Sequence, residues 1–345
     1  MKANKWYEEK TFQYYKIENK KAPDHFNHFL NAEKALKGYE SGYETGRKKL
    51  FSILGCFGTN LKIGGGFHCN LGRNIFLGNN VSIGNNVVIL DMGPVKIGNN
   101  VSIEDGVHIY NASHRVKDPN RWKFLRYSNI QIGSNVRLKK NSVLLPGTQI
   151  EDGVVIKEGA VIKGLVTQKD KIMGNEHISK LYDSLSNINW RHSSIECDGK
   201  MDIPYLNNRH NIIKRPFYYR YGHNIKGGEV GFGFVNTHSI FDASCEINIG
   251  NYTLFGPGVN LVTDLNFTEN AILEKIQKCT GEFTSNQCKK GSILIGDNVW
   301  VAGRVTIFPG ITIGNNSALL VPNGIVSKDI PENSVLYPFG IRTKE

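Results

Sequence analysis

The sequence predicts a mainly β chain built from two parallel β-solenoids in tandem, preceded by a helical segment. The first observation is a six-residue spacing of aliphatic side chains that is interrupted by one long loop and then resumes. The second is that this whole pattern occurs twice. In the first half the spaced residues form three runs, which are Leu77, Ile83 and Ile89, then Ile97, Ile103 and Ile109, and after the loop Ile132, Leu138, Leu144, Ile150, Ile156 and Ile162. In the second half they are Ile249, Phe255, Leu261, Ile295, Val301, Ile307, Ile313, Leu319 and Ile325.

Each six-residue repeat is interpreted as a short strand followed by a corner. Glycine or a small polar residue often follows the aliphatic one, as in Ile132-Gly133 and Ile295-Gly296, and a small residue suits a sharp turn. A strand this short buries no apolar face by itself, so the strands must coil and stack their aliphatic side chains into a continuous core. Three such faces per coil predict a triangular prism.

The breaks in the spacing divide the chain into segments. We expect a first solenoid over residues 51–180 with a loop at 110–131, a polar linker at 181–205, and a second solenoid over 206–345 with a loop at 262–294. Residues 1–50 lack the spacing and interleave aromatic with charged side chains. They are interpreted as helices that cover the first solenoid. An arm that binds the acceptor or a partner is the alternative.

Composition and charge restrict the partners of the chain. Its 345 residues, 40% of them hydrophobic, suffice for two domains of ordinary size. The formal net charge of +11 has several explanations. No nucleic-acid-reading motif and no aromatic ladder on a basic face is present, so nucleic acid is not expected as a partner. A phosphate-bearing cofactor and an anionic polysaccharide fit the charge equally well.

The sequence gives no sign of a membrane span, a secretion signal or a metal site. No apolar run is long enough to cross a bilayer, and residues 1–21 lack the apolar core of a signal peptide, so we expect a cytoplasmic protein. No CxxC pair occurs, so neither zinc nor a disulfide framework is expected. The six cysteines are Cys56, Cys69, Cys197, Cys245, Cys279 and Cys288.

The loops that interrupt the solenoids are the expected place for chemistry, because a rigid rod presents reactive groups on its excursions. The first loop begins with Tyr110 and carries His114 just past the end of a strand. A histidine held on a fixed scaffold is suited to act as a general base at neutral pH. A structural or solvated loop histidine is the alternative reading.

Several motifs resemble the hexapeptide-repeat acyltransferases, whose fold is a left-handed parallel β-helix, and within them the maltose, galactoside and nodulation-type O-acetyltransferases. In the first half these are residues 67–75, 87–91 and 95–100, and a loop similar to T-x-x-H-P-x-D-x-x-x-R. In the second half they are residues 215–217, 221–225, 295–300, 308–310 and 327–331.

The resemblance implies transfer of an acyl group, usually acetyl, from coenzyme A to a hydroxyl or an amine. His114 matches the catalytic histidine, and Asp118 and Arg121 lie near the loop's acid and arginine. Asp91 and Asn86 occupy positions that lie close to the acceptor in the family. For Asp91, capping of a turn is an equally good interpretation.

The second half departs from the family at the catalytic histidine. His114 lies five residues after Ile109, and the residue five after Leu261 is Asn266. An amide does not act as a base at neutral pH. We therefore expect the second half to have lost this base, unless another group such as Asp264 replaces it.

The expected acetyl-CoA contacts show the opposite pattern, because here the second half matches the family and the first half departs from it. Trp300 and the pair Ser327-Lys328 match the family, whereas the corresponding first-half positions hold Arg137 and Lys163-Gly164. Acetyl-CoA is expected as a co-substrate, and its predicted contacts are Lys139, Lys140 and Lys163 in the first half and Trp300, Ser327 and Lys328 in the second.

Family active sites lie between adjacent subunits of a trimer, so the resemblance implies a homotrimer. A closed ring of three cannot alternate two domain types, so a ring of first halves would stack on a ring of second halves. We expect the working site between first halves, with His114. The second ring would hold the trimer together or bind substrate.

The acceptor is expected to be a carbohydrate larger than a simple sugar. Sugar acetyltransferases of this group carry a Tyr-Ala-Asn signature and a second acid where this sequence has Ser82-Ile83-Gly84 and Met92. A cell-surface polysaccharide or its precursor is therefore favoured over a small galactoside or maltose. The alternatives are an N-acyltransferase of an amino sugar or antibiotic, and a non-catalytic scaffold.

Overall fold

The computed structural model describes residues 13–16, 31–32, 34–36, 39, 44–116, 118–186, 191–192, 211–214, 216–228, 233–266, 289–338 and 340–343. The chain divides into two compact units, Met1–Glu176 (unit 1) and His177–Glu345 (unit 2). Each unit contains a parallel β-solenoid with three sheets. The predicted fold class, a mainly β chain of parallel β-solenoids, is confirmed.

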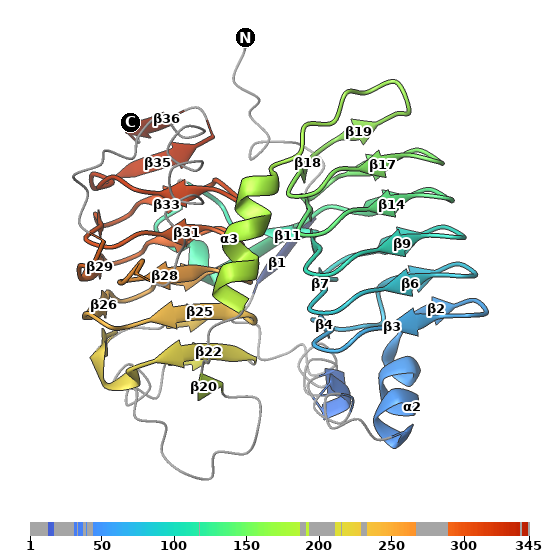
Figure 1. The fold of residues 1–345 in the computed structure, drawn as a ribbon, viewed down its shortest axis with the longest axis horizontal. Helices are drawn as coiled ribbons and strands as arrows, with labels where there is room; N and C mark the ends of the chain where they lie inside the picture. The colour runs from blue at the N-terminus through green and yellow to red at the C-terminus, as the bar shows by residue number, and fades with distance from the viewer. Residues whose placement is uncertain are drawn as a thin grey trace. The chain divides into compact units, whose positions relative to one another are not determined.

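The chain of unit 1 visits three sheets in turn, and one strand in each sheet makes a coil (Figure 1). Sheet 1A contains β2 (Cys56–Phe57), β5 (Ile75–Leu77), β8 (Val95–Ile97), β13 (Ile130–Ile132), β16 (Gln149–Ile150) and β19 (Leu165–Val166). Sheet 1B contains β3 (Lys62–Ile63), β6 (Ser82–Ile83), β9 (Ser102–Ile103), β14 (Arg137–Leu138) and β17 (Val155–Ile156). Sheet 1C contains β4 (His68–Cys69), β7 (Val88–Leu90), β10 (His108–Tyr110), β15 (Val143–Leu144) and β18 (Val161–Ile162).

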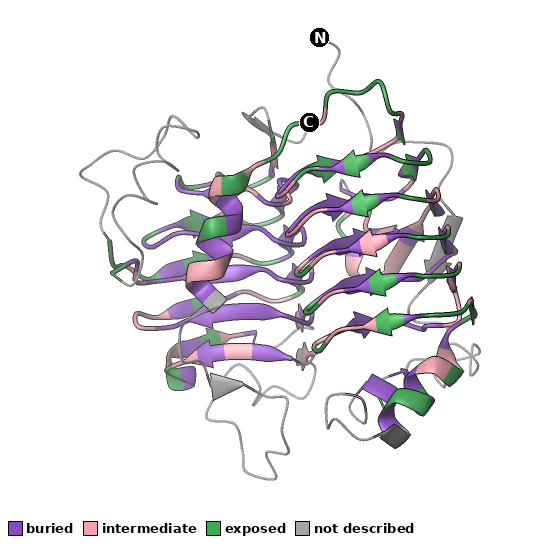
Figure 2. Cartoon of the chain, turned by 45° about the vertical axis from the view of Figure 1, so that its right-hand side comes forward, coloured by how far each residue is buried: buried purple, intermediate pink, exposed green. Residues whose placement is uncertain are grey.

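The core of unit 1 consists of the side chains that the six-residue spacing selected. Leu77, Ile97 and Ile132 pair in register in sheet 1A, as Ile83 and Ile103 do in sheet 1B. These side chains are at most 4% exposed, whereas the turns between sheets 1A and 1B contain exposed residues (Figure 2). Each coil therefore adds one aliphatic layer to a continuous core, as the spacing predicts.

A ladder of asparagines holds the corner between sheets 1A and 1B. Asn60, Asn80, Asn100 and Asn135 all have positive φ, a conformation that asparagine tolerates better than most residues. The side-chain nitrogen of each of the first three donates to the side-chain oxygen of the next asparagine, at 2.8, 2.9 and 3.2 Å. The corner thus gains polar contacts along the axis without a bulky side chain.

The corner after β3 provides a test of this close coil stacking. A Cβ at Gly64 would lie 2.6 Å from the backbone carbon of Gly84, whereas at Gly65 the nearest atom is Asn85 Oδ1 at 3.7 Å. Overpacking of this kind costs about 1–3 kcal/mol. We expect Gly64→Ala to lower the free energy of unfolding in urea by that amount and Gly65→Ala to leave it nearly unchanged. Equal losses would contradict the stacking argument.

The prediction of helices over residues 1–50 is wrong for one part of that segment. Helix α2 (Glu44–Ile53) is present, but β1 (Gln13–Lys16) is a strand. It pairs antiparallel with β12 (Phe124–Tyr127), which also pairs with β11 (Ala112–Ser113). The first loop thus creates a strand edge, and an edge is covered by pairing. Tyr14 and Tyr15 favour a strand.

Unit 2 repeats the three-sheet arrangement. Sheet 2A contains β20 (Arg191–His192), β22 (Phe217–Arg220), β25 (Ser239–Asp242), β28 (Asn260–Val262), β31 (Thr306–Ile307) and β34 (Ile325–Val326). Sheet 2B contains β23 (Ile225–Gly227), β26 (Ile247–Ile249), β29 (Ile293–Ile295) and β32 (Thr312–Ile313). Sheet 2C contains β21 (Asn211–Ile213), β24 (Gly233–Val235), β27 (Leu254–Phe255), β30 (Trp300–Val301), β33 (Ala318–Leu319), β35 (Ser334–Tyr337) and β36 (Gly340–Thr343).

Two details of unit 2 differ from the sequence interpretation. Val326 rather than Ile325 pairs with Ile307 and is buried, because the turn at Asn323, which has positive φ, adds one residue. The predicted linker at 181–205 begins inside helix α3 (Glu176–Ser186). Tyr182 of this helix donates to the carbonyl oxygen of Arg304 at 2.6 Å, and the Arg304 guanidinium lies 3.9 Å from the centre of the Tyr182 ring.

Candidate active site

The first loop leaves the solenoid at the edge between sheets 1C and 1A, directly after β10. Asn111 anchors its base: its side-chain nitrogen donates to Gly93 O at 2.5 Å, and its side-chain oxygen accepts from Met92 N at 3.0 Å. The carbonyl of Asn111 accepts from Ser128 N at 2.9 Å, where the chain returns. The side chain of Asn111 is completely buried. The loop is therefore tied to the preceding coil, a function that the sequence did not reveal.

His114 is held in one orientation by backbone groups of its own loop. Its Nδ1 lies 3.0 Å from the carbonyl oxygen of Arg121, in η1 (Arg121–Lys123), and 3.0 Å from that of Phe124. Carbonyl oxygens only accept hydrogen bonds, so Nδ1 carries the proton, and Nε2 of the neutral ring is the basic nitrogen.

The charge state of His114 also suits a proton acceptor. Desolvation by burial lowers the pKa of His114 to about 4, and the nearby positive charges of Arg121 and Arg126 act in the same direction. The hydrogen bonds to the two carbonyls oppose this shift. At neutral pH the imidazole is uncharged, which is the form that can accept a proton.

Asp118 and Arg121 shape the turn that holds His114. Asp118 Oδ1 accepts from Asn120 N at 2.8 Å, and the carbonyl of Asp118 accepts from Arg121 N at 3.1 Å and Nε at 3.3 Å. The other carboxylate oxygen lies 3.8 Å from Arg115 Nη1. Arg121 is 1% exposed, and burial lowers its pKa to about 10. Both residues thus position His114 through the Arg121 carbonyl.

Asp91 occupies a capping position within the chain. Its side chain is completely buried, and Oδ1 accepts from Asn70 N at 3.0 Å and Leu71 N at 2.8 Å. Oδ2 accepts from Asn74 N at 3.3 Å. Burial raises the pKa of Asp91 to about 7, against these backbone hydrogen bonds, which lower it. The structure thus shows the turn-capping role that the sequence left open.

Asn86 lies at a different corner from His114. It has positive φ and sits between β6 and β7, at the edge where sheet 1B meets sheet 1C. His114 follows β10, at the edge between sheets 1C and 1A. A face of the prism separates the two residues within unit 1, so the described fold does not bring Asn86 to the histidine.

The lysines predicted to contact acetyl-CoA in unit 1 also lie at two edges. Lys139 and Lys140 follow β14, and Lys163 follows β18. Lys139 Nζ forms an ion pair with Glu104 Oε1 at 2.7 Å, and Glu104 Oε2 accepts from Lys140 N at 3.0 Å. Lys163 shares the edge of His114. Of the three lysines, Lys163 is therefore the one that lies at the same edge as His114 within unit 1.

The predicted contacts in unit 2 are similarly divided. Trp300 begins β30 of sheet 2C and is 6% exposed. Ser327 and Lys328 follow β34, at the edge where sheet 2A leads to sheet 2B. Trp300 lies where sheet 2B leads to sheet 2C, so the face of sheet 2B separates it from Ser327 and Lys328. The three residues therefore do not form one cradle within unit 2.

The second loop lacks a histidine at the position of His114. Asn266 donates through its backbone N–H to Asp264 Oδ1 at 2.9 Å, and Asp264 Oδ2 lies 4.0 Å from Lys290 Nζ. Asp264 therefore closes the base of the loop. The middle of the loop, residues 267–288, lies outside the described residues.

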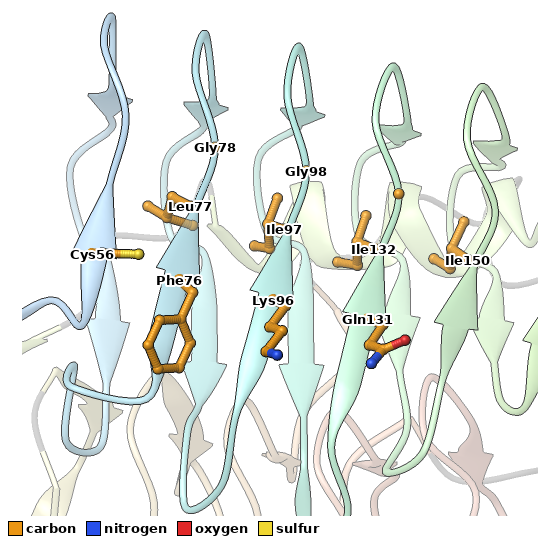
Figure 3. A pocket seen from close by; sticks show the side chains of 11 residues that line it. Cys56, Phe76, Leu77, Gly78, Lys96, Ile97, Gly98, Gln131, Ile132 and Ile150 are labelled. Carbon is orange, nitrogen blue, oxygen red and sulfur yellow. The ribbon is translucent and has the colours of Figure 1, made fainter.

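A shallow groove of about 440 Å³ runs over the outer face of sheet 1A (Figure 3). Phe76, Lys96 and Gln131 project from successive strands, while Ile97 and Ile132 of the same strands belong to the core. None of the predicted site residues lines it. Over the part of the chain that is described, no cluster of three or more His, Cys, Asp or Glu side chains is arranged to hold a metal, and no described helix has the length and apolarity of a membrane span.

The family model and the sequence relatives that this chain matches agree with this architecture. Residues 129–164 match the family model of the bacterial transferase hexapeptide (six repeats). Over 123 residues the chain is 35% identical to galactoside O-acetyltransferase of Escherichia coli, covering 36% of this chain and 54% of that protein. Over 127 residues it is 37% identical to a putative acetyltransferase of Saccharomyces cerevisiae, covering 36% and 57%. The chain thus spans about half the length of the curated relatives it matches.

Solved structures align more loosely. A maltose O-acetyltransferase from Clostridium difficile 630 aligns with a TM-score of 0.40 at 23% identity, covering 44% of this chain and 88% of that one. A galactoside acetyltransferase in complex with coenzyme A aligns with a TM-score of 0.31 at 28% identity, covering 39% and 62%. The repeat indicates the class that this chain is similar to: residues 129–164 carry the bacterial transferase hexapeptide repeat. Its sequence relatives are O-acetyltransferases and putative acetyltransferases, so the predicted resemblance is confirmed.

Proposed function

We propose that this protein is an acetyl-CoA-dependent O-acetyltransferase that modifies a carbohydrate hydroxyl in the cytoplasm. The observation that carries the proposal is the fixed His114 ring, whose protonated Nδ1 faces two carbonyl oxygens and whose Nε2 is the basic nitrogen. The sequence similarity to galactoside O-acetyltransferase supports acetyl transfer to a sugar.

The proposed reaction is a direct transfer with His114 as general base. His114 Nε2 takes the proton of the acceptor hydroxyl while the oxygen attacks the thioester carbonyl. The tetrahedral intermediate then collapses, the carbon–sulfur bond breaks, and the proton on Nε2 passes to the departing thiolate. A neutral imidazole is required at the start, and the lowered pKa of His114 supplies it. Asp118 and Arg121 keep the ring in this orientation.

We propose a cell-surface polysaccharide or its precursor as the acceptor and a homotrimer as the assembly. The absence from this sequence of the acceptor signature of small-sugar acetyltransferases supports the first statement. Lys163 at the edge of His114 is the proposed contact for the co-substrate in unit 1. In unit 2, we propose that Trp300, Ser327 and Lys328 bind coenzyme A together with residues of a neighbouring subunit, which complete the cradle.

Acceptor screening with a thiol-release assay tests this function. The full-length protein is incubated with acetyl-CoA and either neutral oligosaccharides, amino sugars or an aminoglycoside. Faster thiol release with hydroxyl acceptors, and an acetyl ester in the product, supports O-acetylation. Amide products instead would support an N-acyltransferase. No binding of coenzyme A by calorimetry would identify a non-catalytic scaffold.

The pH dependence of kcat/KM follows from the pKa of His114. Because this pKa is lowered to about 4, the base form predominates from pH 5 upward. With a neutral oligosaccharide as acceptor, we expect no acidic limb due to His114 between pH 5 and 8. The profile is measured in Asp91→Asn as well, because Asp91 has a pKa of about 7 and titrates in this range. A limb with a midpoint near 6.5 in both proteins would contradict the burial of the ring.

A further inference from the structure

A second cavity in unit 1, of about 660 Å³, is unrelated to the sequence motifs. It lies between the N-terminal helical residues, including α2, and the first turn at the edge between sheets 1C and 1A. Its lining consists of Asn31, Lys34, Ala35, Lys49, Ser52, Ile53, Leu54, Gly55, Leu71 and Arg73. We refer to it as the basic pocket.

The described charged side chains of the basic pocket are all positive. Among the described residues that line it, the charged ones are Lys34, Lys49 and Arg73, and none is Asp or Glu. Neither Lys34 nor Lys49 forms an ion pair with any other described residue, and both side chains are exposed. Leu54 and Leu71 provide an apolar floor, being 8% and 1% exposed. A concave site with cations on an apolar wall concentrates the field and attracts anions.

The basic pocket lies on the same edge of the solenoid as the His114 loop. Its wall residues Leu71 and Arg73 belong to the turn that Asp91 caps, one coil before the turn that Asn111 holds. Two coil steps of about 4.8 Å each separate the turn of Leu71 and Arg73 from the base of the loop, roughly 10 Å along the axis. Lys139, Lys140 and Lys163 lie in coils beyond the loop, on its other side. The basic pocket is thus on the side of the loop away from Lys163, the proposed co-substrate contact of unit 1.

We propose that the basic pocket binds an anionic group, a carboxylate or a phosphate, of the carbohydrate acceptor. This inference rests on the proposed function and adds a substrate class to it: an acidic oligosaccharide whose negative charge lies on the order of 10 Å, about two coil steps, from the hydroxyl that is acetylated. The apolar floor contacts the sugar ring that carries the charge. Lys34 and Lys49 form the rim, and Arg73 lies on the wall of the solenoid.

Direct binding to the full-length protein, without acetyl-CoA, tests the proposal. The probes are cellobiose, cellobiouronic acid, lactose and lactose 1-phosphate, measured by calorimetry at low salt. We expect at least tenfold tighter binding of the acidic probe in one of the two pairs. A preference for the uronic acid identifies a sugar carboxylate as the ligand, and a preference for the phosphate identifies a phosphorylated precursor.

The variants are Lys34→Glu and Lys49→Glu, with Lys62→Glu as control. Lys62 is an exposed lysine of β3 that lies outside the basic pocket and changes the net charge equally. We expect the two pocket variants to abolish the preference for the acidic probe and the control to keep it. Equal affinity of acidic and neutral probes for the unmodified protein, or an equal effect of all three variants, overturns the proposal. If the unmodified protein binds the acidic probe more tightly but releases no thiol with any acceptor, the proposed function is refuted and the proposal for the basic pocket stands.

Discussion

Replacement of His114 by alanine is expected to remove most of the acetyl transfer activity while leaving the fold intact. General-base catalysis contributes about 10²–10⁴-fold, so kcat should fall by that factor. Its Nδ1 contacts two backbone carbonyls, and these remain in place in the variant. The measurement is thiol release from acetyl-CoA with a hydroxyl acceptor, alongside the unfolding midpoint of both proteins.

The control for His114→Ala is Asn266→Ala in unit 2. Asn266 occupies the matching position of the second loop, where an amide provides no base. We expect kcat of this variant to equal that of the unmodified protein. Added imidazole should restore part of the activity of His114→Ala, because it supplies a base without changing the scaffold. Equal loss in the two variants would show that the histidine is not the base.

The fold was predictable because its signal is local and repeats. Leu77, Ile97 and Ile132 lie 20 and 35 residues apart in sequence, yet each fills the same place in its own six-residue repeat. The one misplaced layer, at Ile325, follows from a turn that contains an extra residue. Pairing of β1 with β12 joins segments more than a hundred residues apart, and no periodic pattern reports such a contact.

The site was predictable only where a single residue type decides the chemistry. A histidine in the loop of a rigid scaffold is a candidate base from sequence alone, whereas the role of Lys139 depends on its neighbour. Glu104 belongs to the preceding coil, but the loop places it 35 residues before Lys139, and the ion pair was not anticipated. The basic pocket was missed for the same reason, because Lys34, Lys49 and Arg73 meet only after folding.

The two solenoids have the same three-sheet arrangement, but their loops differ. In unit 1 the loop returns two carbonyl oxygens to His114, and Asn111 fixes its base. In unit 2 the two ends of the loop are held together by Asp264 and Lys290. An acid engaged at the loop base is a poor substitute for an oriented imidazole. The stacked aliphatic core is independent of these differences, so one copy can keep its fold while its loop changes.

Replacement of Asp91 by alanine is expected to produce the largest loss of stability among the predicted site residues. The carboxylate accepts the N–H groups of Asn70, Leu71 and Asn74, and Asn70 and Leu71 are buried. Each buried donor left without an acceptor costs about 1–3 kcal/mol, so with two such donors the free energy of unfolding should fall by about 2–6 kcal/mol. Urea unfolding measures this difference.

Asp105→Ala is the matched control for the loss of a capping carboxylate. Asp105 accepts from Asn85 N at 2.6 Å, but it is exposed, so water replaces the lost acceptor. Its cost should be below about 1 kcal/mol. A stable Asp91→Ala protein with a raised KM for the acceptor would contradict the capping role and assign Asp91 to substrate binding.

Asp91→Asn separates the charge of the cap from its hydrogen bonds. The pKa of Asp91 is raised to about 7 in the folded protein, above the value of about 3.9 for an unfolded chain, so folding favours the protonated form. The stability that this protonation contributes is fully present below pH 4 and is lost as the pH rises to about 7. The unmodified protein should therefore lose stability relative to Asp91→Asn between pH 5 and 8. A difference that is constant over this range would show that the buried carboxylate keeps its ordinary pKa.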